Sequence, residues 1–356
     1  MPDFPAGGSV AGVKFIIAPP AIFSHPIILA GEKGTGAMRR SDHDVTNTIR
    51  TTDLQHVAGE VMRLYRGLYD GTPAAAIEKA FEDLGRLYAG EHPDYQPCDT
   101  EYHDIQHVLD VTLAMARLMD GYERSRNDSP ALPAACFSLG VVTALFHDFG
   151  YLRKRGDRRH RYGAEYTMTH VTRGSKHLHS YLPRIGLRHY ASTGATLVHY
   201  TGYERRAETI PLDDRLLRRV GHMLGTADII AQMADRCYLE KCRDRLYPEF
   251  VLGGLARRKL PDGRTHILFS SGDDLVRKTP GFYTNAAKRL DLQLARAYEY
   301  AGHYFKGQNL YLEEMQKNVR YAQAVGSAPN TDMLRRTPPS TLKKGVEPYP
   351  KDLVIR

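Results

Sequence analysis

The sequence predicts an all-α fold, a bundle of many helices with flexible ends. From Leu54 onward, apolar residues recur at helical spacing in one stretch after another. Strand-type patterns are almost missing, the exception being the short run THILFSS at 265–271. The two ends, 1–45 and 327–356, are rich in glycine, proline or lysine and show no sustained period. We therefore expect a flexible tail at each end.

The middle of the chain, 46–326, is predicted to form one helical domain. Its first two helices correspond to the stretches LQHVAGEVMRLYRGLY and TPAAAIEKAFEDLGRLYAG. Residues 255–282 lack a helical period, and we interpret them as either a lid or a plain insertion. The remaining helices are predicted at 103–124, 131–150, 163–182, 189–201, 213–245, 283–304 and 308–324.

Composition narrows the class of protein. Hydrophobic residues make up 42% of the 356 residues, enough for a buried core. The net charge of +8 fits anionic partners such as nucleotides, or simply a solubilising surface, and no basic block is long enough to predict nucleic-acid binding. The four cysteines form no CxxC pair and suit a reducing cytoplasm. No apolar run reaches the roughly 18 residues of a membrane span, and we expect no membrane association.

The first chemical motif is YHDIQHVLDV at 102–111. His103 and His107 are four residues apart, so on a helix they lie on one face, one turn apart. Such a face can bind a metal ion, or place one imidazole beside it. Taken alone, the pair equally fits ordinary histidines with hydrogen-bonded partners.

Two further motifs supply an imidazole and carboxylates. The apolar stretch CFSLGVVTALFHDFGY ends in His147 and Asp148, which are costly to bury unless they are paired or coordinated. Asp228 lies in the apolar helical run LGTADIIAQ and also needs a partner, either a metal ion or an arginine. With His107, these residues form the ordered set H…HD…D. Two imidazoles and two carboxylates suit Zn²⁺, Mn²⁺ or Fe²⁺.

With this set in place, the chain resembles the HD-domain metal-dependent phosphohydrolases. Within them, YHDIQHVLDV is similar to the YHNxxHxxDV signature of class I cyclic-nucleotide phosphodiesterases. RYGAEYTMTH places Glu165 at the position of a glutamate behind the metal-bound water, and LDDRLLRRVGHMLGTADIIAQ is similar to the segment that leads to the last metal aspartate. The resemblance covers roughly residues 100–325.

The resemblance implies the following roles. His107, His147, Asp148 and Asp228 hold the first divalent ion, and Asp148 bridges to a second ion; zinc, manganese, magnesium or iron can occupy such a site. A bridging hydroxide is the nucleophile. His103 is the general acid that protonates the leaving ribose oxygen, and Glu165 orients His103 or the water. The family usually has asparagine where Asp104 stands here.

Five residues are candidates for substrate contact. Tyr102 belongs to the YH motif, and Tyr151 stands where phosphodiesterases usually carry a histidine near the phosphate. His199 lies on an apolar helix, where it is equally well interpreted as a core histidine. Gln308 and Tyr311 have the spacing of the family's purine clamp, but the same spacing is common on any helix.

The predicted function is hydrolysis of a 3′,5′-cyclic nucleotide. The alternatives are an HD hydrolase of another nucleotide or phosphoester, a di-iron HD-type oxygenase, and a binding module with a structural metal. The sequence does not predict the oligomeric state, the base preference or the physiological metal.

Overall fold

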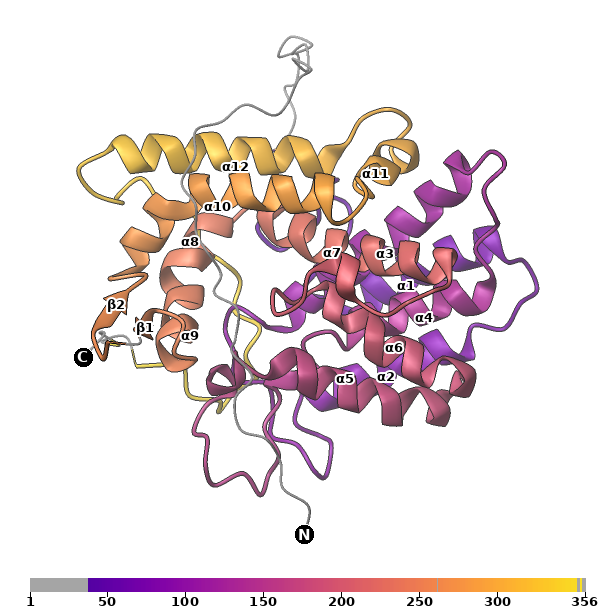
Figure 1. Ribbon diagram of the computed structural model, residues 1–356, viewed down its shortest axis with the longest axis horizontal. Coiled ribbons are helices and arrows are strands. Elements are labelled where there is room, and N and C mark those ends of the chain that lie inside the picture. Colours follow the sequence, from indigo (N-terminus) through magenta and orange to yellow (C-terminus); the bar gives the residue numbers. More distant parts are fainter. Residues whose placement is uncertain (1–37, 261, 351–352, 354–356) are drawn as a thin grey trace. The chain divides into compact units, whose positions relative to one another are not determined.

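The computed structural model describes residues 38–260, 262–350 and 353, and within them the all-α prediction is confirmed. The predicted tail at 1–37 lies outside the described residues. Figure 1 shows helices throughout, with a single short hairpin. The α-helices, in chain order, are α1 (Leu54–Leu68), α2 (Ala75–Tyr88), α3 (Ile105–Ser125), α4 (Ala134–Leu145), α5 (His170–Tyr181), α6 (Ala191–Leu197), α7 (Arg215–Ala234), α8 (Tyr238–Lys241), α9 (Tyr247–Leu252), α10 (Gly272–Leu292), α11 (Glu299–Tyr304) and α12 (Leu310–Ser327).

Short 3₁₀ turns and one π-helical turn connect these helices. The π turn η7 (Cys242–Leu246) joins α8 to α9 without a break. The 3₁₀ turns are η1 (Phe149–Tyr151), η2 (Gly163–Tyr166), η3 (Leu182–Ile185), η4 (Arg188–Tyr190), η5 (Val198–Tyr200) and η6 (Ala207–Thr209).

The core is built around α3, which packs against α4, α7 and α11. Close packing explains a glycine on α3: a Cβ at Gly121 would lie 1.9 Å from the carbonyl oxygen of Tyr300 in the neighbouring helix α11. α4 is apolar on all sides and its residues from Cys136 to Leu145 are buried, as expected for a central helix. The stretch Ala134–Tyr151 is long and apolar enough to cross a membrane, but 89% of it is buried inside the helical unit, so it is a core segment here.

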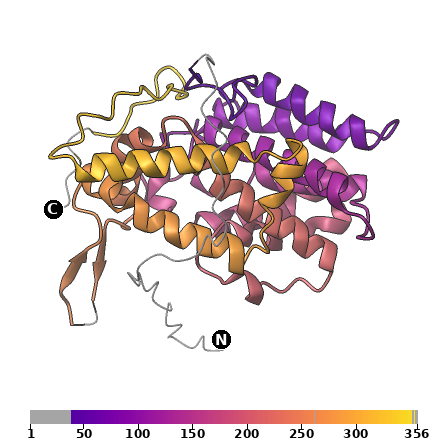
Figure 2. The same ribbon diagram turned by 90° about the horizontal axis from the view of Figure 1, so that it is seen from above.

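The segment 255–282, predicted to lack helix, contains more regular structure than expected. Strands β1 (Arg257–Lys259) and β2 (Thr265–Ile267) pair antiparallel into a hairpin that projects from the helices (Figure 2). α10 then begins at Gly272, eleven residues before the predicted start at 283. The side chain of Ser271 caps this helix by accepting a hydrogen bond from the Asp274 amide. The start signal is therefore a local cap rather than a periodic apolar pattern.

Parts of the two predicted tails make defined contacts with the helices. Asp44, placed in the N-terminal tail, forms a buried ion pair with Arg117 of α3 at 2.6 Å. At the other end, residues 328–350 follow α12 without regular structure and hydrogen-bond to several helices. We call residues 328–350 the C-terminal strap.

Candidate metal centre

Three packed helices bring the four predicted ligands together. His107 lies in the first turn of α3, whose N-cap is Asp104; the Asp104 side chain accepts a hydrogen bond from the His107 amide at 2.9 Å. His147 and Asp148 follow the end of α4, and Asp228 lies within α7. Because α3 packs against both α4 and α7, these four side chains lie close together in the interior of the helical domain.

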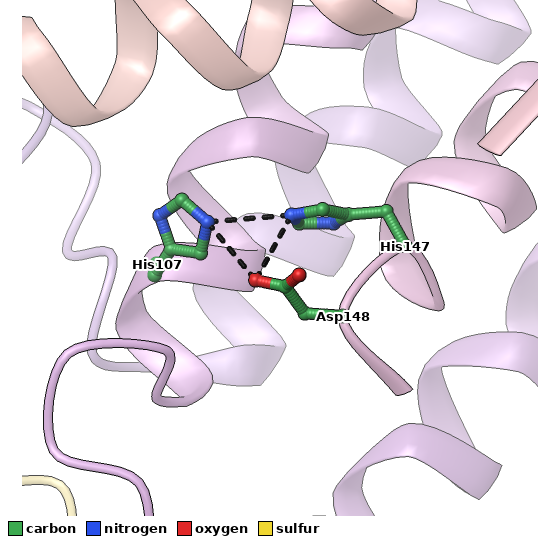
Figure 3. Close-up of side chains that lie close together, drawn as sticks. All are labelled: His107, His147 and Asp148. Atoms are coloured by element: carbon green, nitrogen blue, oxygen red, sulfur yellow. Dashed lines mark hydrogen bonds and ion pairs between the residues drawn. The ribbon is translucent and has the colours of Figure 1, made fainter. Parts of the chain in front are cut away.

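The side chains of His107, His147 and Asp148 point toward one another (Figure 3). His107 Nε2 lies 3.3 Å from Asp148 Oδ2 and 3.3 Å from His147 Nε2, and His147 Nε2 lies 3.2 Å from Asp148 Oδ2. Asp228 Oδ1 is 3.5 Å from His107 Nε2 and 4.0 Å from His147 Nε2. His107, His147 and Asp148 are all buried and could hold a metal ion. Three of the four predicted ligands therefore form the group that could hold a metal ion, and Asp228 lies beside them.

The donor set fits a divalent cation. His147 Nδ1 lies 2.7 Å from the Ala144 carbonyl oxygen, which fixes the proton on Nδ1 and turns the lone pair of Nε2 toward the cluster. Asp148 Oδ2 is buried and accepts no hydrogen bond. Two imidazole nitrogens aimed at one another and a buried carboxylate oxygen without a donor are costly arrangements, and a bound cation would satisfy all of them.

The electrostatics of the cluster point the same way. Burial alone would raise the pKa of Asp148, but the neighbouring His147 and His107 lower it well below its ordinary value. Burial would lower the pKa of His147, yet Asp148 and Asp228 raise it to about 9. The two carboxylates therefore favour a positive charge at this position.

His103 lies beside the cluster but has a different partner. Its Nδ1 is 2.5 Å from Oε2 of Glu249, a fully buried carboxylate whose Oε1 accepts the Tyr102 amide at 2.7 Å. Burial disfavours the charged imidazole, but Glu249 outweighs this effect and raises the pKa of His103 above its ordinary value.

Glu249, rather than Glu165, is the glutamate that orients His103. The Glu165 side chain instead accepts hydrogen bonds from the amides of Arg161 and Tyr162 and so closes a local turn. Sequence reasoning missed Glu249 because no motif surrounds it. The one available signal was a carboxylate inside the apolar stretch YPEFV at 247–251, which had to find a buried partner.

Aromatic stacking fixes the ring of His103. Tyr151 is buried between His103 and His170, with ring centroids 4.3 Å and 4.5 Å away. Tyr151 therefore stacks on both imidazoles at the edge of the cluster, with its ring plane within 17° of His103 and 19° of His170. His170 Nε2 lies 3.8 Å from Asp148 Oδ1, while its Nδ1 lies 2.6 Å from the Thr167 carbonyl oxygen. His170 thus presents a lone pair to the second oxygen of Asp148.

Tyr102 contacts the candidate metal cluster indirectly, through Gln232. It is buried, and its hydroxyl lies 3.1 Å from Gln232 Oε1; Gln232 in turn donates to Asp228 Oδ1 at 3.3 Å.

His199 is also buried, and its Nδ1 lies 2.8 Å from Glu204 Oε1. Burial would raise the pKa of Glu204, but His199 and then the nearby His170 lower it.

Gln308 and Tyr311 do not form a clamp at the metal centre. Gln308 is exposed, lies just before α12 and donates to Glu313 of that helix. The Tyr311 hydroxyl accepts a hydrogen bond from Arg117 at 3.1 Å. Arg117 is ten residues after His107 on α3, which corresponds to about 15 Å along the helix axis.

No protein-family model matches the chain, and no curated protein matches its sequence. The likeness to HD-domain phosphohydrolases therefore depends on the motifs alone.

Proposed function

We propose that the protein is a metal-dependent phosphohydrolase and that its substrate is a 3′,5′-cyclic nucleotide. The observation that supports this proposal is the pairing of two features. His107, His147, Asp148 and Asp228 converge at 3.2–4.0 Å, and an imidazole outside the cluster, His103, is held next to them by a buried glutamate. Phosphoester cleavage requires a cation that activates the nucleophile and an acid that protonates the leaving group, and a cation site beside an imidazole can supply both.

The first metal ion would be held by His107, His147, Asp148 and Asp228, and the bound ions would supply the hydroxide nucleophile and neutralise charge on the phosphoryl oxygens. Asp148 Oδ1 and His170 Nε2 would contribute to a second ion, because they face one another at 3.8 Å and His170 Nδ1 is already committed to Thr167.

His103 would protonate the leaving alkoxide. Its Nδ1 is bonded to Glu249, so the proton to be delivered is the one on Nε2. Glu249 raises the pKa of His103 above its ordinary value and so favours the charged ring, while the stacked Tyr151 restricts its rotation. After proton transfer, the neutral imidazole would take a proton from solvent and restore the acid.

The position of His170 supports a second candidate function. A histidine on each side of Asp148 gives two ions protein ligands, as in the di-iron oxygenase branch of the HD fold. That function predicts iron in the purified protein and consumption of oxygen. Hydrolysis of another nucleotide by the same ions predicts no oxygen consumption and a different substrate preference.

The test combines metal analysis with hydrolysis of cyclic AMP and cyclic GMP in the presence of Mn²⁺ or Mg²⁺. We expect hydrolysis that a chelator abolishes, loss of bound metal in Asp148→Asn, and in His103→Ala a loss of about 10²–10⁴-fold in kcat with metal retained. Gln308→Ala is a matched control because this exposed side chain hydrogen-bonds to Glu313 and is not part of the cluster. Full activity in His103→Ala, or turnover that resists chelation, would contradict the proposal.

We further propose a cytoplasmic location. Cys98, Cys136, Cys237 and Cys242 are all buried and unpaired, as expected of thiols kept reduced.

A further inference from the structure

The C-terminal strap lies against the turn that carries His103. The strap, drawn in yellow after α12 in Figure 2, returns across the helical unit instead of leaving it. Arg277 of α10 holds its start by donating to the carbonyls of Gly326 and Ala328. Further along, the Arg336 amide donates to Glu240 at 3.2 Å. The strap is thus fixed before it reaches the metal centre.

A hydroxyl of the strap is bonded to the residue that follows His103. Thr341 Oγ1 donates to Asp104 Oδ2 at 2.5 Å, and the other oxygen of Asp104 caps α3 through the His107 amide. Asp104 is only 2% exposed. With Thr341 removed, its carboxylate would retain Arg245 at 3.8 Å as a neighbour but would lose its only hydroxyl donor.

A direct hydrogen bond and a bridging arginine join the strap to Glu101, two residues before His103. The Tyr349 amide donates to Glu101 Oε1 at 3.3 Å, and the buried Tyr349 ring packs edge-on against Tyr162 at 5.2 Å. Arg245 of the π turn connects Glu101 to the strap. It donates to the Glu101 carbonyl at 3.4 Å and to the carbonyls of Pro338 and Pro339 at 3.0 Å and 2.9 Å. The turn 101–104 is therefore held at both ends by one segment.

We propose that the strap positions His103, with Thr341 as its positioning residue. Glu249 orients the imidazole from inside the unit, while the strap fixes the backbone on which that imidazole is mounted. The inference rests on the proposed function, since the position of His103 matters most if this residue donates a proton. Small displacements of a catalytic group reduce rates strongly because proton transfer requires hydrogen-bonding distance.

The test compares two phosphodiesters that differ in their need for an acid. Cyclic AMP expels an alkoxide that must be protonated, whereas bis(p-nitrophenyl) phosphate expels a phenolate that is stable without a proton. In Thr341→Val, which removes the hydroxyl and preserves the shape, we expect kcat for cyclic AMP to fall by about tenfold, a fraction of what a positioned acid supplies. The kcat for the aryl ester should change by less than about twofold, because its leaving group needs no acid.

Two matched variants complete the experiment. Thr341→Ser keeps the hydroxyl and should restore hydrolysis of cyclic AMP, while Ser340→Ala removes the neighbouring exposed hydroxyl and should behave as the wild type. Equal losses on both esters would show a general structural defect and overturn the positioning role, as would no loss on either.

Hydrogen exchange separates failure of this inference from failure of the proposed function. In metal-free protein, the amides of residues 101–107 should exchange faster in Thr341→Val than in the wild type or Ser340→Ala. If the wild type hydrolyses neither ester, the proposed function is wrong, and exchange then decides the contact: faster exchange supports the strap's hold on the turn, and unchanged exchange overturns it.

Discussion

Replacing Asp148 by asparagine tests the metal centre directly. Asp148 Oδ2 lies 3.2–3.3 Å from both imidazole nitrogens, and its side chain is only 5% exposed. The substitution removes the buried negative charge shared by these two ligands while nearly preserving the volume. We expect the variant to lose metal binding, because an amide is a far weaker ligand than a carboxylate for a divalent ion.

The size of the effect follows from linkage. An ion present at 100 times its Kd stabilises the folded protein by about 2.7 kcal/mol. For roughly 310 ordered residues, the entropy of unfolding is about 0.7 kcal/mol per kelvin, so the wild type should gain about 4 °C in Tm. Breaking a buried ion pair also costs about 3–5 kcal/mol, so the metal-free variant should melt below the metal-free wild type.

The assay is thermal unfolding with and without Mn²⁺, Zn²⁺, Fe²⁺ or Mg²⁺, with bound metal measured after dialysis. Asp262→Asn is the control, since Asp262 pairs only with Arg264 at an exposed position on the hairpin. The reasoning is refuted if Asp148→Asn gains as much stability from the metal as the wild type. It is equally refuted if none of the four ions raises the Tm of the wild type.

Three further predictions concern other contacts. Glu249→Gln removes the charge that raises the pKa of His103, so the alkaline limb of the plot of kcat against pH should move to lower pH. An alkaline limb that does not move would contradict the role of Glu249 in setting the pKa of His103. Burial, and then Arg184 and His92, lower the pKa of His177 to about 3, so this histidine stays neutral in the folded protein. Its contribution to the free energy of unfolding is therefore present above pH 6.5 and is lost as the pH falls, by about 1.4 kcal/mol at pH 5.5. Urea titrations should show that His177→Phe removes this loss. Asp44→Asn breaks the buried pair with Arg117 and should cost about 3–5 kcal/mol in urea unfolding, whereas Asp42→Asn at a more exposed site should cost less than about 1 kcal/mol; similar costs would mean that Asp44 does not anchor its segment.

The residues of the candidate metal cluster leave a pattern in the sequence, whereas the residues that support them do not. An ion requires certain side chains, and a helix imposes a spacing, so His107, His147, Asp148 and Asp228 leave a pattern in the chain. Glu249 lies 146 residues from His103, and any buried carboxylate could have served. The contact between them depends on packing that no local pattern records. The same holds for Thr341 and Asp104, which are 237 residues apart.

The purine clamp predicted at Gln308 and Tyr311 shows how a local spacing can suggest a contact that the fold does not make. Gln308 and Tyr311 have the right types and spacing, but nothing in that spacing fixes which face of a helix meets the metal centre. Tyr311 is instead used to satisfy Arg117, whose buried charge already pairs with Asp44. A buried arginine needs several acceptors, and this demand outweighs a pattern that many helices share.

The apolar character of α4 has a consequence for synthesis of the protein. A ribosome adds about 5–20 residues per second, so α4 is complete roughly 4–18 seconds before α7, one of the helices that cover it, has been translated. During this interval the nascent chain displays the 18-residue stretch Ala134–Tyr151, which is suited to insertion into lipid or to capture by a chaperone. Translation products that stop before residue 215 should therefore aggregate or be degraded.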